Sequence, residues 1–227
     1  MKNKNLIFTL FFLALTLALT AAVKMVDVQA IGPEGTSVGF AGINAKMAAV
    51  LGFNETLYNI AGLLGYVVIA VFLIFAMVGL VQLIKRRSLL QVDKNILVLG
   101  GMYFAVFAMY VAFEKIVINY RPVIIPGETE VAASFPSSHT AMAIVVIAGA
   151  LMQLGYYVKS KGLKNLLAAM LWILMIAAVA TRVLSGAHWL SDIVAGMLYA
   201  LTLIFAYKAV LFSVEKHDRP GSYIPKH

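Results

Sequence analysis

The residues best suited to chemistry lie in two short polar stretches in the second half of the chain. One stretch contains His188 and Asp192, which are four residues apart at the start of a predicted helix and therefore share a face. The carboxylate can then accept a hydrogen bond from one imidazole nitrogen and leave the other nitrogen free. A free, oriented imidazole acts as a nucleophile, a general base or a metal ligand. His188 is therefore the first candidate catalytic residue.

Two arginines accompany these groups. Arg121 and Arg182 lie at the ends of apolar segments, where a charge near membrane depth is costly. Each guanidinium has a planar fork of donors that can hold a phosphate through two hydrogen bonds. Each can instead anchor a helix end among lipid head groups. Because two arginines would repel a cation and no further carboxylates are near, we expect no metal at this site.

The other polar stretch ends in Pro136-Ser137-Ser138-His139, directly before a long apolar segment. Ser137 and Ser138 suit the N-cap and first turn of a helix, where free backbone N–H groups and the helix dipole attract an anion. Capping alone is the alternative role of Ser137. His139 follows in the first turn of the same helix and is suited to protonating a leaving oxygen.

The segments that must position these residues are apolar enough to cross a membrane. Of the 227 residues, 62% are hydrophobic and only 12% are charged. Runs of this length and composition predict an all-α, six-transmembrane-helix bundle formed by a single domain over residues 1–227. The predicted spans are 6–23, 61–84, 95–114, 138–158, 164–183 and 190–212.

A shorter amphipathic segment separates the first two predicted spans. Phe40, Ile43, Met47, Val50 and Leu51 recur there at helical spacing. The pattern predicts an extracytoplasmic interfacial helix that lies on the outer leaflet. Such a helix either packs over the bundle or guides lipid toward a site.

The net charge of +8 follows the expected membrane topology and does not indicate nucleic-acid binding. Basic residues cluster at the ends of apolar runs, which marks the cytoplasmic side. The clusters are Lys85, Arg86 and Arg87; Lys159, Lys161 and Lys164; and Lys208, Lys216, Arg219 and Lys226. Six spans then place both termini inside and both polar stretches outside. Lys2 and Lys4 agree with this topology, although they also fit the start of a cleaved signal peptide.

The polar stretches resemble the type 2 phosphatidic acid phosphatases, a family of membrane lipid phosphatases. The three motifs of that family are Lys-x6-Arg-Pro, Pro-Ser-Gly-His and Ser-Arg-x5-His-x3-Asp. This chain has, in the same order, Arg121-Pro122, Pro136-Ser137-Ser138-His139 and Thr181-Arg182-x5-His188-x3-Asp192. The resemblance covers residues 114–192.

The resemblance implies a metal-independent phosphatase that needs no organic cofactor. His188 would attack phosphorus to form a phosphohistidine, Asp192 would orient His188, and His139 would protonate the leaving group. The phosphoryl oxygens would be bound by Arg121, Arg182, Ser137 and the backbone N–H of Ser138.

Three positions depart from the family motifs. The family lysine stands seven residues before the arginine, where this chain has Glu114, and Lys115 follows one position late. A shift of one residue rotates a helical side chain by about 100°, so Lys115 is the least secure of the expected phosphate ligands. Ser138 replaces glycine and Thr181 replaces serine, and both changes keep the backbone N–H or the hydroxyl.

The expected substrate is a lipid phosphate or diphosphate at the outer face of a plasma membrane. An isoprenoid diphosphate such as undecaprenyl diphosphate is the first choice, with phosphatidylglycerophosphate or phosphatidic acid as alternatives. Two alternatives are not enzymes: the same residues also fit a membrane transporter for an anion or lipid, or an inactive lipid-binding relative. The chain has no cysteine, which excludes a thiolate nucleophile, and the oligomeric state is left open.

Overall fold

The computed structural model describes residues 2–217 and the side chains of residues 4–215. Arg219 and Lys226, and the side chains of Lys2 and Lys216, lie outside this range. Apart from two isolated β-bridges, all regular structure in residues 2–217 is helical. The α-helices are α1 (Lys2–Met25), α2 (Ala41–Leu51), α3 (Glu55–Arg86), α4 (Lys94–Lys115), α5 (Ser138–Tyr157), α6 (Lys161–Leu184) and α7 (Leu190–His217). Short 3₁₀ helices occur at Pro33–Gly35 and Leu89–Gln91.

Every α-helix except α2 is long and apolar enough to span a bilayer. The all-α, multi-pass membrane fold predicted from the sequence is therefore confirmed. The predicted span 138–158 overruns α5 by one residue, and the other predicted spans lie inside their helices. Residues 41–51, within the segment expected to be interfacial, form α2.

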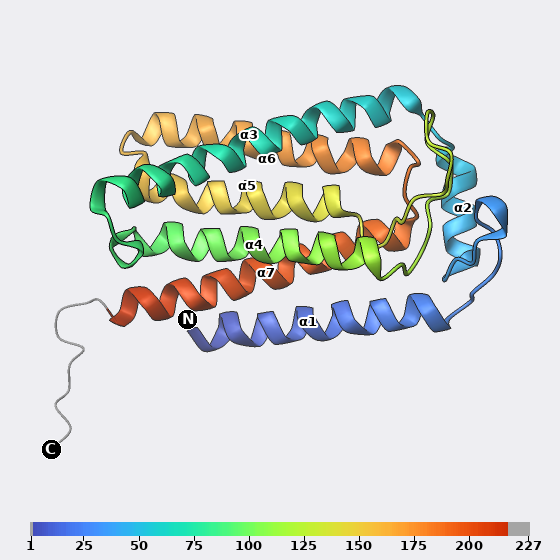
Figure 1. Ribbon diagram of the computed structural model, residues 1–227, viewed down its shortest axis with the longest axis horizontal. Helices are drawn as coiled ribbons and strands as arrows, with labels where there is room; N and C mark the ends of the chain where they lie inside the picture. The colour runs from blue at the N-terminus through green and yellow to red at the C-terminus, as the bar shows by residue number, and fades with distance from the viewer. Residues whose placement is uncertain (1, 218–227) are drawn as a thin grey trace, which may run out of the picture.

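The spanning helices pack with α5 at the centre of the bundle (Figure 1). Small side chains such as Ala141, Ala143 and Ala150 are buried on α5, which lets its neighbours approach closely. In Figure 1, α3 and α6 lie along one side of α5, and α1 packs against α7 on the other. α3 crosses this arrangement obliquely.

The two ends of the bundle differ in content. The start of α1, the end of α7 and the loops that carry the basic clusters lie at one end (Figure 1). The other end carries α2, the long α4–α5 segment 116–137 and the α6–α7 turn 185–189. Both polar stretches therefore meet at a single end, as the predicted topology requires.

The α6–α7 turn is fixed against the junction of α2 and α3. Gly186 has a φ of 65°, and a Cβ built there would lie 1.7 Å from the carbonyl oxygen of Gly52. Only glycine fits such a conformation and such an approach. Next to it, the Asn54 N–H donates to the Ser185 carbonyl at 3.0 Å, while the Asn54 side chain caps α3. The turn that carries His188 is thus held in one position.

Candidate active site

His188 lies in the α6–α7 turn with its imidazole buried. Its Nδ1 is 3.1 Å from the Ser134 carbonyl oxygen and 3.7 Å from Oδ2 of Asp192. A carbonyl oxygen only accepts hydrogen bonds, so the geometry assigns the proton to Nδ1 and the lone pair to Nε2. Nε2 is buried without a hydrogen-bond partner. The turn therefore presents a nitrogen that can act as a nucleophile.

Burial lowers the pKa of His188 below its ordinary value, because a charged imidazole is poorly solvated there. Asp192 opposes this effect by favouring the protonated ring. The guanidinium groups of Arg121 and Arg182 add to the lowering. His188 is therefore held in the neutral form that nucleophilic attack requires.

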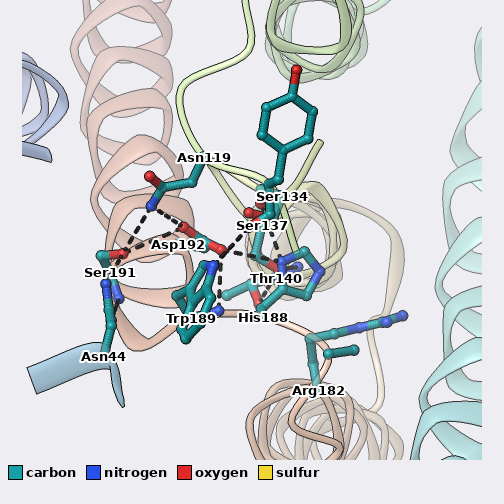
Figure 2. A network of polar contacts seen from close by, with 12 residues as sticks. Asn44, Asn119, Ser134, Ser137, Thr140, Arg182, His188, Trp189, Ser191 and Asp192 are labelled. Atoms are coloured by element: carbon teal, nitrogen blue, oxygen red, sulfur yellow. Dashed lines mark hydrogen bonds and ion pairs between the residues drawn. The ribbon is translucent and has the colours of Figure 1, made fainter. Parts of the chain in front are cut away.

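Asp192 is fully buried in the first turn of α7 (Figure 2). Its Oδ2 accepts from the Trp189 N–H at 3.1 Å, and its Oδ1 accepts from Asn119 at 3.3 Å and Ser191 at 3.4 Å. The contact with His188 is within ion-pair range but longer than a hydrogen bond. The sequence predicted a hydrogen bond from His188 to Asp192, but Nδ1 of His188 instead faces the Ser134 carbonyl. A backbone carbonyl leaves no signal in the pattern of side chains, so this partner could not be predicted.

The start of α5 packs directly on α7. The Ser137 N–H donates to the Asp192 carbonyl at 2.9 Å, and a Cβ at Gly196 would lie 2.7 Å from the Ser137 carbonyl oxygen. Ser137 is fully buried, and its Oγ accepts from the Thr140 N–H as the N-cap of α5. Its side chain lines neither of the two cavities that meet at the site. The structure thus assigns Ser137 to capping, whereas Ser138 lines both cavities.

Arg182 is 2% exposed in the last turn of α6, and its guanidinium carbon lies 5.3 Å from the centre of the Tyr58 ring. The ring attracts the cation and helps to hold it in place. Arg121 is fixed by its backbone N–H, which donates to Ala132 across the 116–137 segment at 3.0 Å. In both arginines Nε and Nη1 are buried without a hydrogen-bond partner.

His139 lies in the first turn of α5 and faces a cavity of about 640 Å³ between α3, α5 and α6. Arg182, Tyr58 and Ser138 line the same cavity. The His139 ring also approaches Gly65 of α3, where an added Cβ would lie 3.7 Å from Cδ2. His139 and Arg182 therefore meet at one opening, as the motif order predicts.

A smaller cavity of about 20 Å³ lies next to this one and shares Ser138 and Tyr110 with it. It is lined by Arg121 and Ser134 of the 116–137 segment and by His188 of the α6–α7 turn. Glu114 also lines this cavity, whereas Lys115 is exposed and lines neither. Lys115 was predicted as a phosphate ligand, and the structure does not bring it to the site, because its position is rotated on the helix relative to Glu114.

The unpartnered polar atoms are confined to this end of the bundle. Among the described residues, the buried side-chain nitrogen and oxygen atoms without a hydrogen-bond partner belong to Arg121, Ser134, Arg182 and His188. Buried polar groups are normally paired, so such a cluster calls for a ligand. Four of the six atoms are guanidinium nitrogens, which only donate, so a ligand with several acceptor oxygens would satisfy them. Over the same residues, no group of three His, Asp or Glu side chains is placed to bind a metal.

The membrane fold, the motif order and the site geometry agree with a comparison to known protein families. Residues 115–215 match the sequence model of the PAP2 superfamily, the family of type 2 phosphatidic acid phosphatases that the sequence motifs resemble.

Among solved structures, the chain is similar to a transmembrane PAP2-type phosphatidylglycerolphosphate phosphatase from Bacillus subtilis. The two share 18% sequence identity with a TM-score of 0.62, over 94% of this chain and 98% of the other. At this identity the likeness concerns the fold. No curated protein matches the sequence.

Proposed function

We propose that the protein is a lipid phosphatase that removes phosphate from a lipid phosphate or diphosphate through a phosphohistidine. One observation carries the proposal: the unpartnered donors of Arg121 and Arg182 and the free Nε2 of His188 belong to residues that line two neighbouring cavities, with Arg121 and His188 in the same one. A phosphoryl group is the ligand that uses both features, since it offers acceptor oxygens and an electrophilic phosphorus. The match of residues 115–215 to the PAP2 superfamily supports phosphatase activity on a lipid phosphate.

The proposed chemistry has two steps. The Nε2 lone pair attacks phosphorus, the bond from phosphorus to the lipid oxygen breaks, and His139 gives a proton to the leaving oxygen. Water then attacks the phosphohistidine, His139 takes a proton from that water, and phosphate leaves while Nε2 regains its lone pair. Nδ1 keeps its proton throughout, and the Ser134 carbonyl and Asp192 stabilise the positive imidazole of the intermediate.

The phosphoryl oxygens would be held by Arg121, Arg182 and the start of α5. The first N–H groups of a helix have no intrahelical partner and favour an anion, and Ser138 opens onto both cavities. We do not assign a phosphate contact to the Ser137 hydroxyl, because it is buried and serves as the helix cap.

The cavities favour a substrate with a long apolar tail. The 640 Å³ cavity shares Ile69 and Met142 with a further cavity of about 550 Å³ between α3 and α4. Phe72, Phe104 and Phe107 line that second cavity, and Phe104 and Phe107 are exposed on the flank of the bundle. A tail that leaves the phosphate site can therefore follow a continuous apolar path, whereas a soluble phosphate ester gains nothing from it.

Glu114 distinguishes the candidate head groups. Glu114 lines the small cavity together with Arg121, at the position where the family has a lysine. A negative charge there repels the second phosphate of a diphosphate. This feature favours a phosphate monoester such as phosphatidylglycerophosphate over the isoprenoid diphosphate expected from the sequence. The isoprenoid diphosphate remains the second candidate because the apolar path suits its tail.

We also propose that the site faces the outside of a plasma membrane. The basic loops, the start of α1 and the end of α7 lie at the opposite end of the bundle (Figure 1). Basic residues favour the cytoplasmic side of a membrane. The lipid would then be dephosphorylated in the outer leaflet.

Phosphate release by purified protein in detergent tests the proposal. The substrates are phosphatidylglycerophosphate, phosphatidic acid and undecaprenyl diphosphate, each in excess chelator, because the proposed chemistry uses no metal. We expect release by the wild-type protein and at least about a thousandfold less by His188→Ala, which lacks the nucleophile. A burst with acid-labile label on wild-type protein would identify the phosphohistidine.

Asn95→Ala is the matched control, because it removes a buried polar side chain at the far end of the bundle. Its activity per folded molecule should equal that of the wild type. Equal release by wild type and His188→Ala, or no release from any substrate by folded protein, would overturn the proposal and favour transport or passive lipid binding.

A further inference from the structure

Asn119 lies outside the three sequence motifs, yet it contacts the centre of the site. It is 1% exposed in the segment between α4 and α5. Its Nδ2 donates to Oδ1 of Asp192 at 3.3 Å and lies 3.5 Å from Oγ of Ser191 (Figure 2). No cavity at the site includes Asn119, so it has no path to the phosphate.

The orientation of the Asn119 amide is determined by its neighbours. The Gly39 N–H approaches Oδ1 at 3.4 Å, and a backbone N–H can only donate. The NH₂ group must therefore face the Asp192 carboxylate, which can only accept. In the reversed orientation, the NH₂ group would face the Gly39 N–H, and the amide oxygen would face the Asp192 carboxylate.

Asn119 also supports the second partner of His188. The Ser134 N–H donates to the Asn119 backbone carbonyl at 2.9 Å. This bond holds the peptide of Ser134, whose own carbonyl accepts from Nδ1 of His188. Asn119 thus supports both groups that face Nδ1 of His188. Its side chain contacts Asp192, and its backbone carbonyl binds Ser134.

The α1–α2 connection completes this arrangement. Asn44 is fully buried in α2, and its Nδ2 donates to the Gly39 carbonyl at 2.8 Å and to Oγ of Ser191 at 3.0 Å. Its Oδ1 accepts from the Ser191 N–H at 3.2 Å. The Asn44 side chain therefore binds both Gly39, which approaches Asn119, and the first turn of α7.

We propose that Asn119 is a positioning residue for the His188–Asp192 pair, and that Asn44 holds the α1–α2 connection in place for it. The inference rests on the proposed role of His188 as the nucleophile. The amide holds the carboxylate beside Nδ1 and satisfies its negative charge, so Asp192 stabilises the imidazolium of the intermediate without taking the proton from Nδ1.

Loss of the amide donor should change turnover and its pH dependence together. The charged or titratable groups around His188 are Asp192 on α7, Arg121 on the α4–α5 segment, Arg182 on α6 and His139 on α5. With one donor fewer, the Asp192 carboxylate attracts the imidazole proton more strongly. The acid limb of the kcat/KM profile should then move toward higher pH.

The test compares Asn119→Asp and Asn119→Ala with the wild type. Asn119→Asp keeps the shape of the side chain and removes the donor. We expect kcat to fall roughly 10-fold to 100-fold in both variants, with KM within about twofold of wild type. The acid limb should shift upward, most in Asn119→Asp, which adds a carboxylate near Asp192. Asn95→Ala, which deletes a buried asparagine at the far end, should leave kcat and the pH profile unchanged.

Thermal unfolding of each variant in detergent separates positioning from a loss of folding. Should Asn119→Ala fail to fold, the near-isosteric Asn119→Asp still decides the result. A folded Asn119→Asp with the kcat and pH profile of the wild type would overturn the positioning role. If His188→Ala retains full activity, the proposed function itself fails, and the two outcomes are thereby distinguished.

Discussion

The two ends of the bundle both bury polar side chains, but they treat them in opposite ways. At the end away from the site, Gln153 is fully buried, and its Nε2 donates to the Tyr207 hydroxyl at 2.7 Å. Its Oε1 accepts from Asn95 at 2.7 Å. At the site end, the buried atoms of Arg121, Arg182 and His188 described above have no such partners.

This difference shows which polar groups serve stability and which serve chemistry. A satisfied network stabilises the packing of the helices that it joins. Unpartnered buried donors lower stability, and they persist where a ligand or a reaction requires them. The far end therefore holds the helices together, and the site end retains donors for the substrate.

The largest test of this contrast is Arg182→Met. We expect kcat/KM to fall by at least about 100-fold, because a donor fork for the developing charge is lost. The melting temperature should stay unchanged or rise, since an unpaired buried charge has been removed. Activity assays and thermal unfolding in detergent measure both quantities. Arg182→Lys, which keeps the charge without the fork, is the control and should also be impaired.

Gln153→Leu should give the opposite result. The substitution leaves the Tyr207 hydroxyl without its partner, at a cost of about 1–3 kcal/mol, and leaves Asn95 with only its longer contact of 3.3 Å to the Tyr157 hydroxyl. The melting temperature should fall, while the activity of each folded molecule stays at the wild-type level. A large loss of activity per folded molecule would show that the two ends are not separate in function.

The pH dependence of His188 sharpens the comparison further. Because burial lowers its pKa, the acid limb of the kcat/KM profile should lie below the ordinary histidine value of about 6.5. His139 must be protonated to act as an acid, so the profile should be bell-shaped. An acid limb at or above pH 6.5 would contradict the assignment of His188.

The same shift has a consequence for stability. Between the lowered pKa and about 6.5, the unfolded chain binds the proton of His188 and the folded chain does not. The contribution of His188 is therefore complete above pH 6.5 and is lost as the pH falls toward the lowered pKa. Unfolding of His188→Gln should show a smaller decline across this window.

The smallest expected effect concerns Glu114. In Glu114→Gln, the ratio of activity on a diphosphate to activity on a monophosphate should rise several-fold, as expected for one partly screened charge of about 1 kcal/mol. Lys115→Gln is the matched control, because the neighbouring residue lines neither cavity. An equal change in both variants would indicate a general effect of surface charge.

The sequence was sufficient to predict the spanning helices, because bilayer thickness requires long apolar runs. Motif spacing also predicted that His188, Arg182 and His139 would meet, since they share one face of the membrane. The roles of Ser134 and Asn119 could not be predicted. Ser134 acts through a backbone carbonyl, and the contacts of Asn119 join Gly39 and Asp192, residues far apart in the chain.

α3 is much longer than the bilayer requires. Its 32 residues extend over about 48 Å, against roughly 30 Å of hydrocarbon. Such a mismatch is accommodated by tilting, in keeping with the oblique course of α3 in Figure 1. The helix also forms one wall of both apolar cavities.

We therefore expect turnover in vesicles to vary with the acyl-chain length of the host lipid. Equal rates in thin and thick bilayers would contradict this expectation. The thickness of the surrounding membrane would then regulate the enzyme, with no separate sensor domain.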